Sequence, residues 1–162
     1  MPHYMIYHSH PLDSAQQQAI ANGITDLHCE LFSAPSAFVN ISFLPPPTTF
    51  VARSPTRSNF IHAHLRPRGP SFTPQLHSLL QGIKALWHEV VGGTGEGRID
   101  DAKGLHNVFL FEDLVAGMEQ GFVLPKAGEE GTWKGTNWEA FEGRRGRGDE
   151  SVGRLMEELG GK

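Results

Sequence analysis

Apolar and polar residues alternate in the first segment of the chain. Residues 3–7, His-Tyr-Met-Ile-Tyr, repeat with a period of two, which is typical of a strand with one buried face. Tyr4 and Ile6 would point to one face of this strand, and the residues next to them to the other. The pattern therefore predicts a strand that begins directly behind Pro2.

A helical repeat follows. Asp13 and Gln16 form a D-x-x-Q capping pattern, which marks the start of a helix. Apolar residues then recur every three or four positions, at Ile20, Ile24, Leu27 and Leu31. The spacing predicts a helix over residues 14–32. Alternation returns in residues 37–43 and stops at Pro45, which predicts a second strand.

The same order of patterns is repeated further along the chain. Residues 59–65 alternate as a strand, and Thr73 with Pro74 gives an N-cap and a first-turn proline. A helical stripe follows, formed by Leu76, Leu79, Leu80, Ile83, Leu86, Trp87 and Val90. After a glycine-rich loop, residues 106–111 again have strand character.

Two strand-helix-strand units, over about residues 2–47 and 58–112, predict an α/β (α+β) fold. The two βαβ units would share one four-stranded sheet with both helices on one face. The other face would be bare. We expect Tyr4 or Met5, with Val39, Ile41 and Ile61, to lie on it, and such an apolar face is normally buried against other subunits.

The composition changes near residue 125. Residues 1–125 would form the domain of two units, and residues 126–162 an extension rich in Gly, Glu and Arg. In the extension only Val152, Leu155, Met156 and Leu159 form a helical face. We expect this tail to be partly mobile or packed on a neighbouring subunit.

Charge and cysteine content narrow the class of protein. Fourteen Lys and Arg against 18 Asp and Glu give a formal net charge of −4, so no general basic field exists to bind nucleic acid or an anionic membrane. Cys29 is the only cysteine, which excludes an intrachain disulfide and fits a reducing compartment. With no apolar run of about 20 residues and no secretion signal, we expect a cytoplasmic protein.

Pro2 is a candidate for acid/base chemistry. A free amino-terminal proline is a secondary amine, and α-amino groups have a pKa of about 7.7 to 8.0. Such a nitrogen can accept and return a proton near neutral pH once Met1 is removed, whereas with Met1 retained it is an inert amide. On its position alone, Pro2 is better explained as the start of a strand, where a missing N–H need not pair.

Four stretches change that interpretation, in order "PHYMIY", "AIANGITDLH", "FIHAHLRPRG" and "GFVLPKAGEEGTW". Their order and spacing, from Pro2 to about Trp133, resemble the tautomerase superfamily and, within it, the branch of cis-3-chloroacrylic acid dehalogenase. The resemblance implies a small trimeric enzyme of two fused βαβ units with a catalytic amino-terminal proline. It also implies three catalytic residues: Pro2 as acid/base, His28 as a hydrogen-bond donor to substrate, and Glu119 as the residue that activates water.

The resemblance also implies substrate-binding residues. Arg66 matches the first of two arginines that bind a substrate carboxylate, a task that suits the guanidinium fork. Arg68 is the nearest match to the second, but only one residue separates the two here. Arg53 and Arg57 therefore remain alternative carboxylate ligands.

Two aromatic positions complete the candidate site. Tyr4 matches a tyrosine shared with the family, although an aromatic residue in a buried strand is also ordinary core material. Phe109, or Val108 with a different gap, stands where the dehalogenases have a tyrosine that assists the attacking water. Without that hydroxyl, hydration and dehalogenation lose more support than proton transfer, which requires the proline and a bound carboxylate.

Other sites are less well supported by the sequence. His8 with His10, and His62 with His64, could each place two imidazoles on one side of an extended segment. Because no Cys, Asp or Glu stands at a matching spacing, we expect no metal and no cofactor. The stretch "GGTGEG" follows a helix and has no lysine behind it, so we interpret it as a connector rather than a phosphate loop.

Taken together, the sequence predicts a homotrimeric tautomerase that acts on a small α-keto or α,β-unsaturated carboxylate. One alternative is a cofactor-independent hydratase or dehalogenase of 3-haloacrylate-type acids. Another is a noncatalytic trimeric module that keeps the fold. Arginine recognition of a carboxylate does not identify the rest of the substrate.

Overall fold

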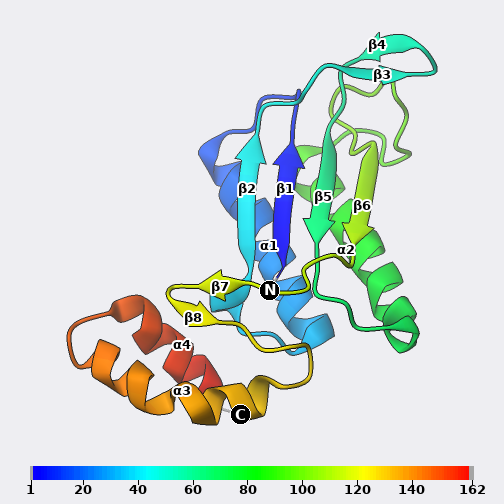
Figure 1. Ribbon diagram of the computed structural model, residues 1–162. Coiled ribbons are helices and arrows are strands. Elements are labelled where there is room, and N and C mark those ends of the chain that lie inside the picture. Colours follow the sequence, from blue (N-terminus) through cyan, green and yellow to red (C-terminus); the bar gives the residue numbers. More distant parts are fainter. Residues whose placement is uncertain (1, 161–162) are drawn as a thin grey trace.

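The computed structural model describes residues 2–160, and its centre is a four-stranded sheet (Figure 1). The strands lie in the order β2-β1-β5-β6. Their bounds are His3–Tyr7 for β1, Asn40–Leu44 for β2, Phe60–His64 for β5 and Asn107–Phe111 for β6. Helices α1 (Ser14–Phe32) and α2 (Thr73–Val91) pack side by side on one face of this sheet.

The strand directions divide the sheet into two equivalent halves. β1 pairs with β2 in parallel, and β5 pairs with β6 in parallel, while β1 and β5 are antiparallel. Each half is therefore one βαβ unit, with α1 or α2 as its crossover. The predicted fold class, two βαβ units in one sheet with both helices on one face, is confirmed.

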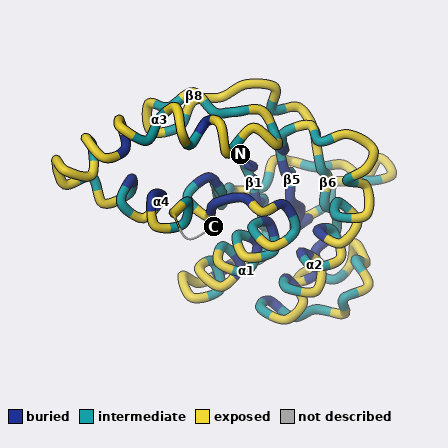
Figure 2. The backbone as a smooth tube through the Cα atoms, turned by 90° about the horizontal axis from the view of Figure 1, so that it is seen from below, coloured by how far each residue is buried: buried dark blue, intermediate teal, exposed yellow. Residues whose placement is uncertain are grey.

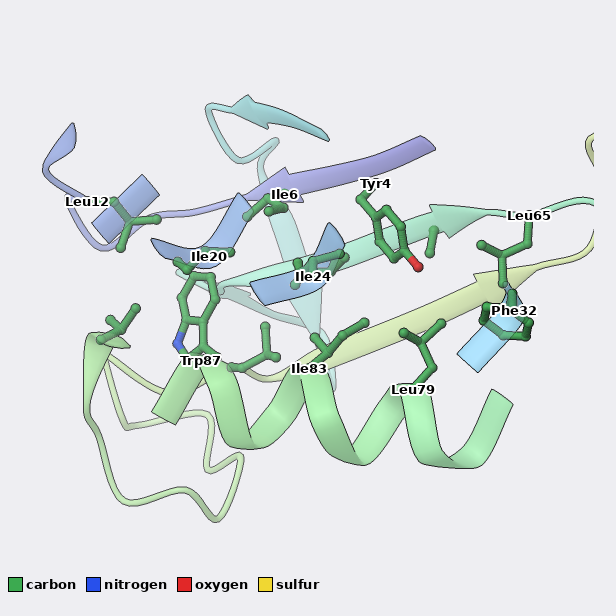
Figure 3. Close-up of a cluster of buried hydrophobic side chains, with 14 residues drawn as sticks. Tyr4, Ile6, Leu12, Ile20, Ile24, Phe32, Leu65, Leu79, Ile83 and Trp87 are labelled. Atoms are coloured by element: carbon green, nitrogen blue, oxygen red, sulfur yellow. The ribbon is translucent and has the colours of Figure 1, made fainter. Parts of the chain in front are cut away.

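Helix α1 begins as the sequence pattern predicts, whereas Thr73, expected as the N-cap of α2, is its first residue and Phe72 takes the N-cap position without a side-chain hydrogen bond. In α1, the Asp13 carboxylate accepts the backbone N–H of Gln16, whose side chain accepts the backbone N–H of Asp13 in return. The buried positions of both helices recur with the helical period, at Ile20, Ile24, His28 and Phe32 in α1 and at Leu79, Ile83, Trp87 and Val91 in α2. Figure 3 shows Ile20, Ile24, Phe32, Leu79, Ile83 and Trp87 of the two helices meeting side chains of the strands.

The core lies between the sheet and the two helices, where the buried residues of Figure 2 gather. Tyr4 pairs with Ala63 and Ile6 with Ile61, and all four are fully buried on the helix side of the sheet. The expectation that Val39, Ile41 and Ile61 lie on the bare face is therefore wrong, because they pack against the core on the helix side. Of the two alternatives in β1, Tyr4 faces the helices and Met5 the open side.

The open face of the sheet carries aromatic and histidine side chains instead. Tyr7 stacks on Phe60 with ring centroids 4.7 Å apart, and His64 stacks on Phe111 at 5.0 Å. Between these two pairs, His62 contacts the ring of Phe109. Apart from Met5 and Leu44, the large apolar side chains of this face are aromatic rings.

Short elements connect the larger ones. The two units are joined by a hairpin of β3 (Thr49–Val51) and β4 (Ser54–Thr56), and a second hairpin consists of β7 (Met118–Glu119) and β8 (Phe122–Val123). Two 3-10 helices, η1 (Ser36–Phe38) and η2 (Pro70–Phe72), precede β2 and α2. Residues 37–38, expected to start the second strand, thus belong to η1.

Beyond β8 the chain forms α3 (Glu130–Arg145) and α4 (Glu150–Gly160). These helices share a second apolar core, made of Phe38, Trp133, Phe141, Val152, Leu155 and Met156. The pattern had indicated a helical face only in the region of α4, because apolar residues are sparse in α3. Packing of this tail on a neighbouring subunit stays a prediction. Among the described residues, no helix is long and apolar enough to cross a membrane.

Asn59 is a buried polar residue that holds three loops together. It is fully buried, and its Oδ1 accepts hydrogen bonds from the backbone N–H groups of Ser9 and His10 at 2.9 and 3.0 Å. Its Nδ2 donates to the carbonyl oxygens of Ala102 and Gly104. One side chain thereby satisfies four backbone groups at the end of the sheet near β3 and β4.

We predict that Asn59→Ala lowers the free energy of unfolding by about 3 kcal/mol or more, because four backbone groups lose their partner in a buried site. Urea denaturation measures this change. Asn22→Ala, at an exposed position of α1, is the control and should change stability by no more than about 0.5 kcal/mol. A loss of less than about 1 kcal/mol for Asn59→Ala would mean that water replaces the amide.

Candidate active site

The candidate residues meet at one end of the sheet. Because β1 and β5 run antiparallel with His3 opposite His64, the start of β1 lies beside the end of β5. Pro2 precedes β1 at this end, and Arg66 and Arg68 follow β5 (Figure 1). The pairing thus brings together residues that are more than 60 positions apart in the sequence.

Pro2 is connected to Glu119 through Asn40. The side chain of Pro2 is fully buried, and its carbonyl oxygen accepts the backbone N–H of Asn40 at 3.1 Å. The Asn40 side chain donates from Nδ2 to Oε1 of Glu119 at 2.7 Å. The second carboxylate oxygen of Glu119 is buried and has no hydrogen-bond partner among the described residues.

Burial raises the pKa of the Glu119 carboxyl, and the hydrogen bond from Asn40 acts in the opposite direction. A carboxylate with one oxygen held and the other without a partner can accept a proton or orient a water molecule. Sequence reasoning missed Asn40, because a single polar residue at the start of a strand carries no motif. Only the parallel register, which sets Asn40 opposite His3, could have indicated it.

Tyr4 and His28 form a buried pair. The Tyr4 hydroxyl lies 2.8 Å from Nδ1 of His28, and both side chains are almost completely inaccessible. Burial raises the pKa of Tyr4, so the phenol keeps its proton, and we assign it as the donor of the hydrogen bond to Nδ1 of the neutral imidazole. The proton of His28 is then on Nε2, which makes Nε2 a hydrogen-bond donor.

His28 is neutral at ordinary pH. Its pKa is lowered to about 3, first by burial and then by the positive charge of Arg68. A neutral imidazole that is fixed through Nδ1 suits hydrogen bonding to a substrate oxygen better than proton exchange.

Arg66 is buried and already paired. Its Nη1 donates to the carbonyl oxygen of Pro125 at 2.7 Å, and its Nη2 donates to Oε1 of Glu130 at 2.8 Å. Only 9% of the Arg66 side chain is exposed. Its Nε is buried and has no partner among the described residues. The arginine expected to bind substrate is therefore occupied by a carboxylate of its own chain.

Arg68 lies next to Arg66 and His28. Its guanidinium carbon is 4.9 Å from the ring centroid of Phe32 and 5.3 Å from that of Phe72, within the range of cation-π contacts. His28, Phe32, Arg66 and Arg68 line one small recess. The structure thus brings His28 together with both expected arginines.

A larger cavity of about 380 Å³ adjoins Arg66. Its wall comes from the end of β5, the loop before β7 and the segment after β8, and it includes Leu114, Val115, Met118, Leu124 and Lys126. The lining is mostly apolar, with Arg66 and Lys126 as its charged residues. Such a cavity can accept the apolar body of a ligand whose anionic group is held by arginine.

Three of the sequence candidates lie apart from this cluster in the single chain. Phe109 is on the open face of the sheet, where it is 49% exposed and contacts His62. Arg53 and Arg57 belong to the β3-β4 hairpin region, at the end of the sheet opposite to Pro2 (Figure 1). The described residues contain no group of three or more His, Cys, Asp or Glu side chains that could hold a metal ion.

Comparison with known proteins agrees with this fold. The Tautomerase_3 family model, described as "Putative oxalocrotonate tautomerase enzyme", matches residues 1–138. No curated protein matches the sequence. The expected resemblance to the tautomerase superfamily is confirmed.

Solved structures show the same fold at low sequence identity. The crystal structure of a member of the cis-3-chloroacrylic acid dehalogenase (cis-CaaD) family has a TM-score of 0.67 at 24% identity, covering 83% of this chain and 91% of that chain. A fused 4-OT protein described as a symmetric trimer gives 0.58 at 14% identity, with coverages of 78% and 98%. A macrophage migration inhibitory factor-like protein from Entamoeba histolytica has a TM-score of 0.53 at 14% identity, with coverages of 76% and 98%.

The low pKa of His28 predicts a pH dependence of stability. Between pH 6.5 and about 3, unfolded His28 binds a proton that the folded protein does not bind, so stability falls as the pH falls through this range. Relative to His28→Phe, which cannot titrate, wild type should lose up to about 1.4 kcal/mol per pH unit more. Urea denaturation at pH 5 and 6 tests this, and an NMR titration of His28 with a midpoint near 6.5 would contradict it.

Proposed function

Because this chain belongs to the Tautomerase_3 family, we propose that it catalyses keto-enol tautomerisation of a small α-keto or α,β-unsaturated carboxylate, with Pro2 as the acid/base. The observation that carries the proposal is the convergence on one end of the sheet. Buried Pro2 is tied through Asn40 to Glu119 there, and His28 lines a recess with Arg66 and Arg68.

In the proposed reaction, the mature chain begins at Pro2. The neutral secondary amine removes the O–H proton of the enol, the C–O bond becomes a carbonyl, and the electrons of the C=C bond move to carbon. The resulting ammonium of Pro2 then delivers the same proton to that carbon. Burial lowers the pKa of an amine below its solution value of about 7.7 to 8.0, so the neutral form is available at pH 7.

The surrounding residues have separate tasks in this scheme. His28 donates from Nε2 to the substrate oxygen as negative charge develops on it. The arginines bind the substrate carboxylate and fix its orientation relative to Pro2. Tyr4 keeps His28 in the tautomer that can donate, through its 2.8 Å hydrogen bond to Nδ1.

We further propose that the enzyme is a homotrimer and that the open face of the sheet is its interface. This face exposes Phe109 and Phe111, and exposed aromatic groups of this size favour association. Phe109 would then contribute to the substrate site of a neighbouring subunit. The fused 4-OT structure of similar fold is itself described as a trimer.

Hydration or dehalogenation of a 3-haloacrylate-type acid is the second candidate. It is favoured by Glu119, whose carboxyl has a raised pKa and one buried oxygen without a partner, as expected of a residue that activates water. The absence of a hydroxyl at Phe109 speaks against it. A noncatalytic trimeric module would be favoured by the pairing of Arg66 with Glu130.

Pro2→Ala should lower kcat/KM for phenylenolpyruvate ketonisation by about 100-fold or more, since the acid/base group contributes about 10² to 10⁴ to such reactions. Pro11→Ala, which changes an exposed proline beyond the opposite end of β1, should leave the rate unchanged. Mass spectrometry must show that wild type and Pro2→Ala both lack Met1. Equal rates for wild type and Pro2→Ala would remove Pro2 from the mechanism.

Glu119→Gln separates the two candidate reactions. For tautomerisation, ketonisation should stay within about fivefold of wild type, because the amide still accepts the hydrogen bond of Asn40 and Pro2 still carries the proton. For dehalogenation, halide release from cis-3-chloroacrylate would be abolished, because no carboxylate activates water. We expect ketonisation in both proteins and no halide release from either. Halide release by wild type alone would favour the second candidate.

A further inference from the structure

Arg66 of the candidate site forms a partly buried ion pair with Glu130, a residue that has no role in the proposed reaction. Glu130, the first residue of α3, contacts Nη2 of Arg66 through Oε1 at 2.8 Å. The side chain of Glu130 is 27% exposed and that of Arg66 is 9% exposed. A contact this well shielded is screened by salt far less than a surface ion pair.

Glu130 is held in this position from several sides. Its Oε2 accepts the backbone N–H of Gly128 at 2.7 Å, and it stands in the first turn of α3, where the helix dipole favours a negative charge. Burial alone would raise the pKa of Glu130, but backbone hydrogen bonds and Arg66 outweigh burial and lower it. The residue is therefore a fixed anion next to Arg66.

Arg68, in contrast, has no carboxylate on its guanidinium among the described residues. Its guanidinium rests on the rings of Phe32 and Phe72. The nearby acid, Glu112, is exposed and accepts the backbone N–H of Arg68 instead. The two arginines therefore offer one unpaired cation, not two.

The adjoining cavity does not supply a second buried cation. Of its charged lining residues, Arg66 is paired with Glu130, and Lys126 is exposed to solvent. The remaining wall is mostly apolar, as at Leu114 and Leu124. A second carboxylate in this space would lose its hydration, meet no unpaired buried cation and be repelled by Glu130.

We propose that Glu130 determines the charge specificity of the site: by neutralising Arg66, it restricts the substrate to monocarboxylates and excludes dicarboxylates. This inference rests on the proposed function in one respect, namely that the arginine pair binds the carboxylate of the substrate. Specificity of this kind comes from a repulsive element as much as from an attractive one. Glu130 supplies the repulsive element.

The experiment measures binding of unreactive acids to the full-length protein by calorimetry, with butanoate as the monocarboxylate and glutarate as the dicarboxylate. In Glu130→Gln, Arg66 regains an unpaired charge, so the affinity for glutarate relative to butanoate should rise by about tenfold. Glu129→Gln is the matched control. It removes the same charge one residue away, at an exposed position with no ion pair, and should leave the ratio within about twofold.

An unchanged ratio of glutarate to butanoate affinity in Glu130→Gln would overturn the inference. An equal loss of affinity for both acids would also overturn it, because Glu130 would then only hold Arg66 in position. Lack of butanoate binding to wild type would also overturn it. If Glu130→Gln does not fold, Glu130→Asp shortens the side chain by one methylene and should raise the ratio by a smaller amount. Binding of these acids needs no chemistry at Pro2. If the affinity ratio changes in Glu130→Gln while Pro2→Ala keeps full ketonisation activity, the result would contradict the proposed reaction and not the inference about Glu130.

Discussion

The antiparallel pairing of β1 with β5 is the constraint on which the candidate site depends. Within each βαβ unit the two strands are parallel, so the start of one strand lies beside the start of the other and not beside its end. Joined antiparallel, with His3 opposite His64, the two units place the start of one strand against the end of the other. Pro2 therefore lies at the same end of the sheet as Arg66. With a parallel pairing, the proline and the arginines would lie at opposite ends.

Charge at this end of the sheet is arranged in compensated groups. Arg66 can be buried because Glu130 and the carbonyl oxygen of Pro125 satisfy it, as buried charges require. His28 and Tyr4 are both held neutral by burial. Among the described residues here, Glu119 keeps one buried carboxylate oxygen without a hydrogen-bond partner and Arg66 keeps its Nε, while no carboxylate lies on the guanidinium of Arg68. Unused polar atoms in a buried site are where a bound molecule can gain most.

Local patterns in the sequence predicted the parts of the fold that depend on local rules. The bounds of α1 follow from the Asp13 cap and the helical period, and both agree with the structure. The alternation of residues 3–7 also predicted strand β1 correctly, but it could not indicate which face of the strand is buried. Tyr7 and Phe60 on the open face are as apolar as Tyr4 and Ile61 in the core, so composition did not distinguish the two faces.

Contacts between distant segments could not be predicted in the same way. Asn40 contacts Glu119 across 79 positions, and Arg66 contacts Glu130 across 64. Neither contact leaves a periodic trace in the sequence, because each involves one isolated polar residue on a separate element. Helix α3 was missed for a related reason, since its few apolar residues pack on α4 and η1 rather than on the sheet.

The packing of the second core on η1 connects the carboxy-terminal helices to the segment that leads into β2. Phe38 belongs to that core, and both the backbone N–H and the hydroxyl of Ser36 donate to Glu158, 122 positions later. Asn40, which holds Pro2 and Glu119, follows η1 after a single residue. Loosening of α4 would therefore free Ser36 and Phe38, which stand shortly before Asn40 in the chain. The position of the segment that enters β2 thus depends on a helix more than 100 residues further along the chain.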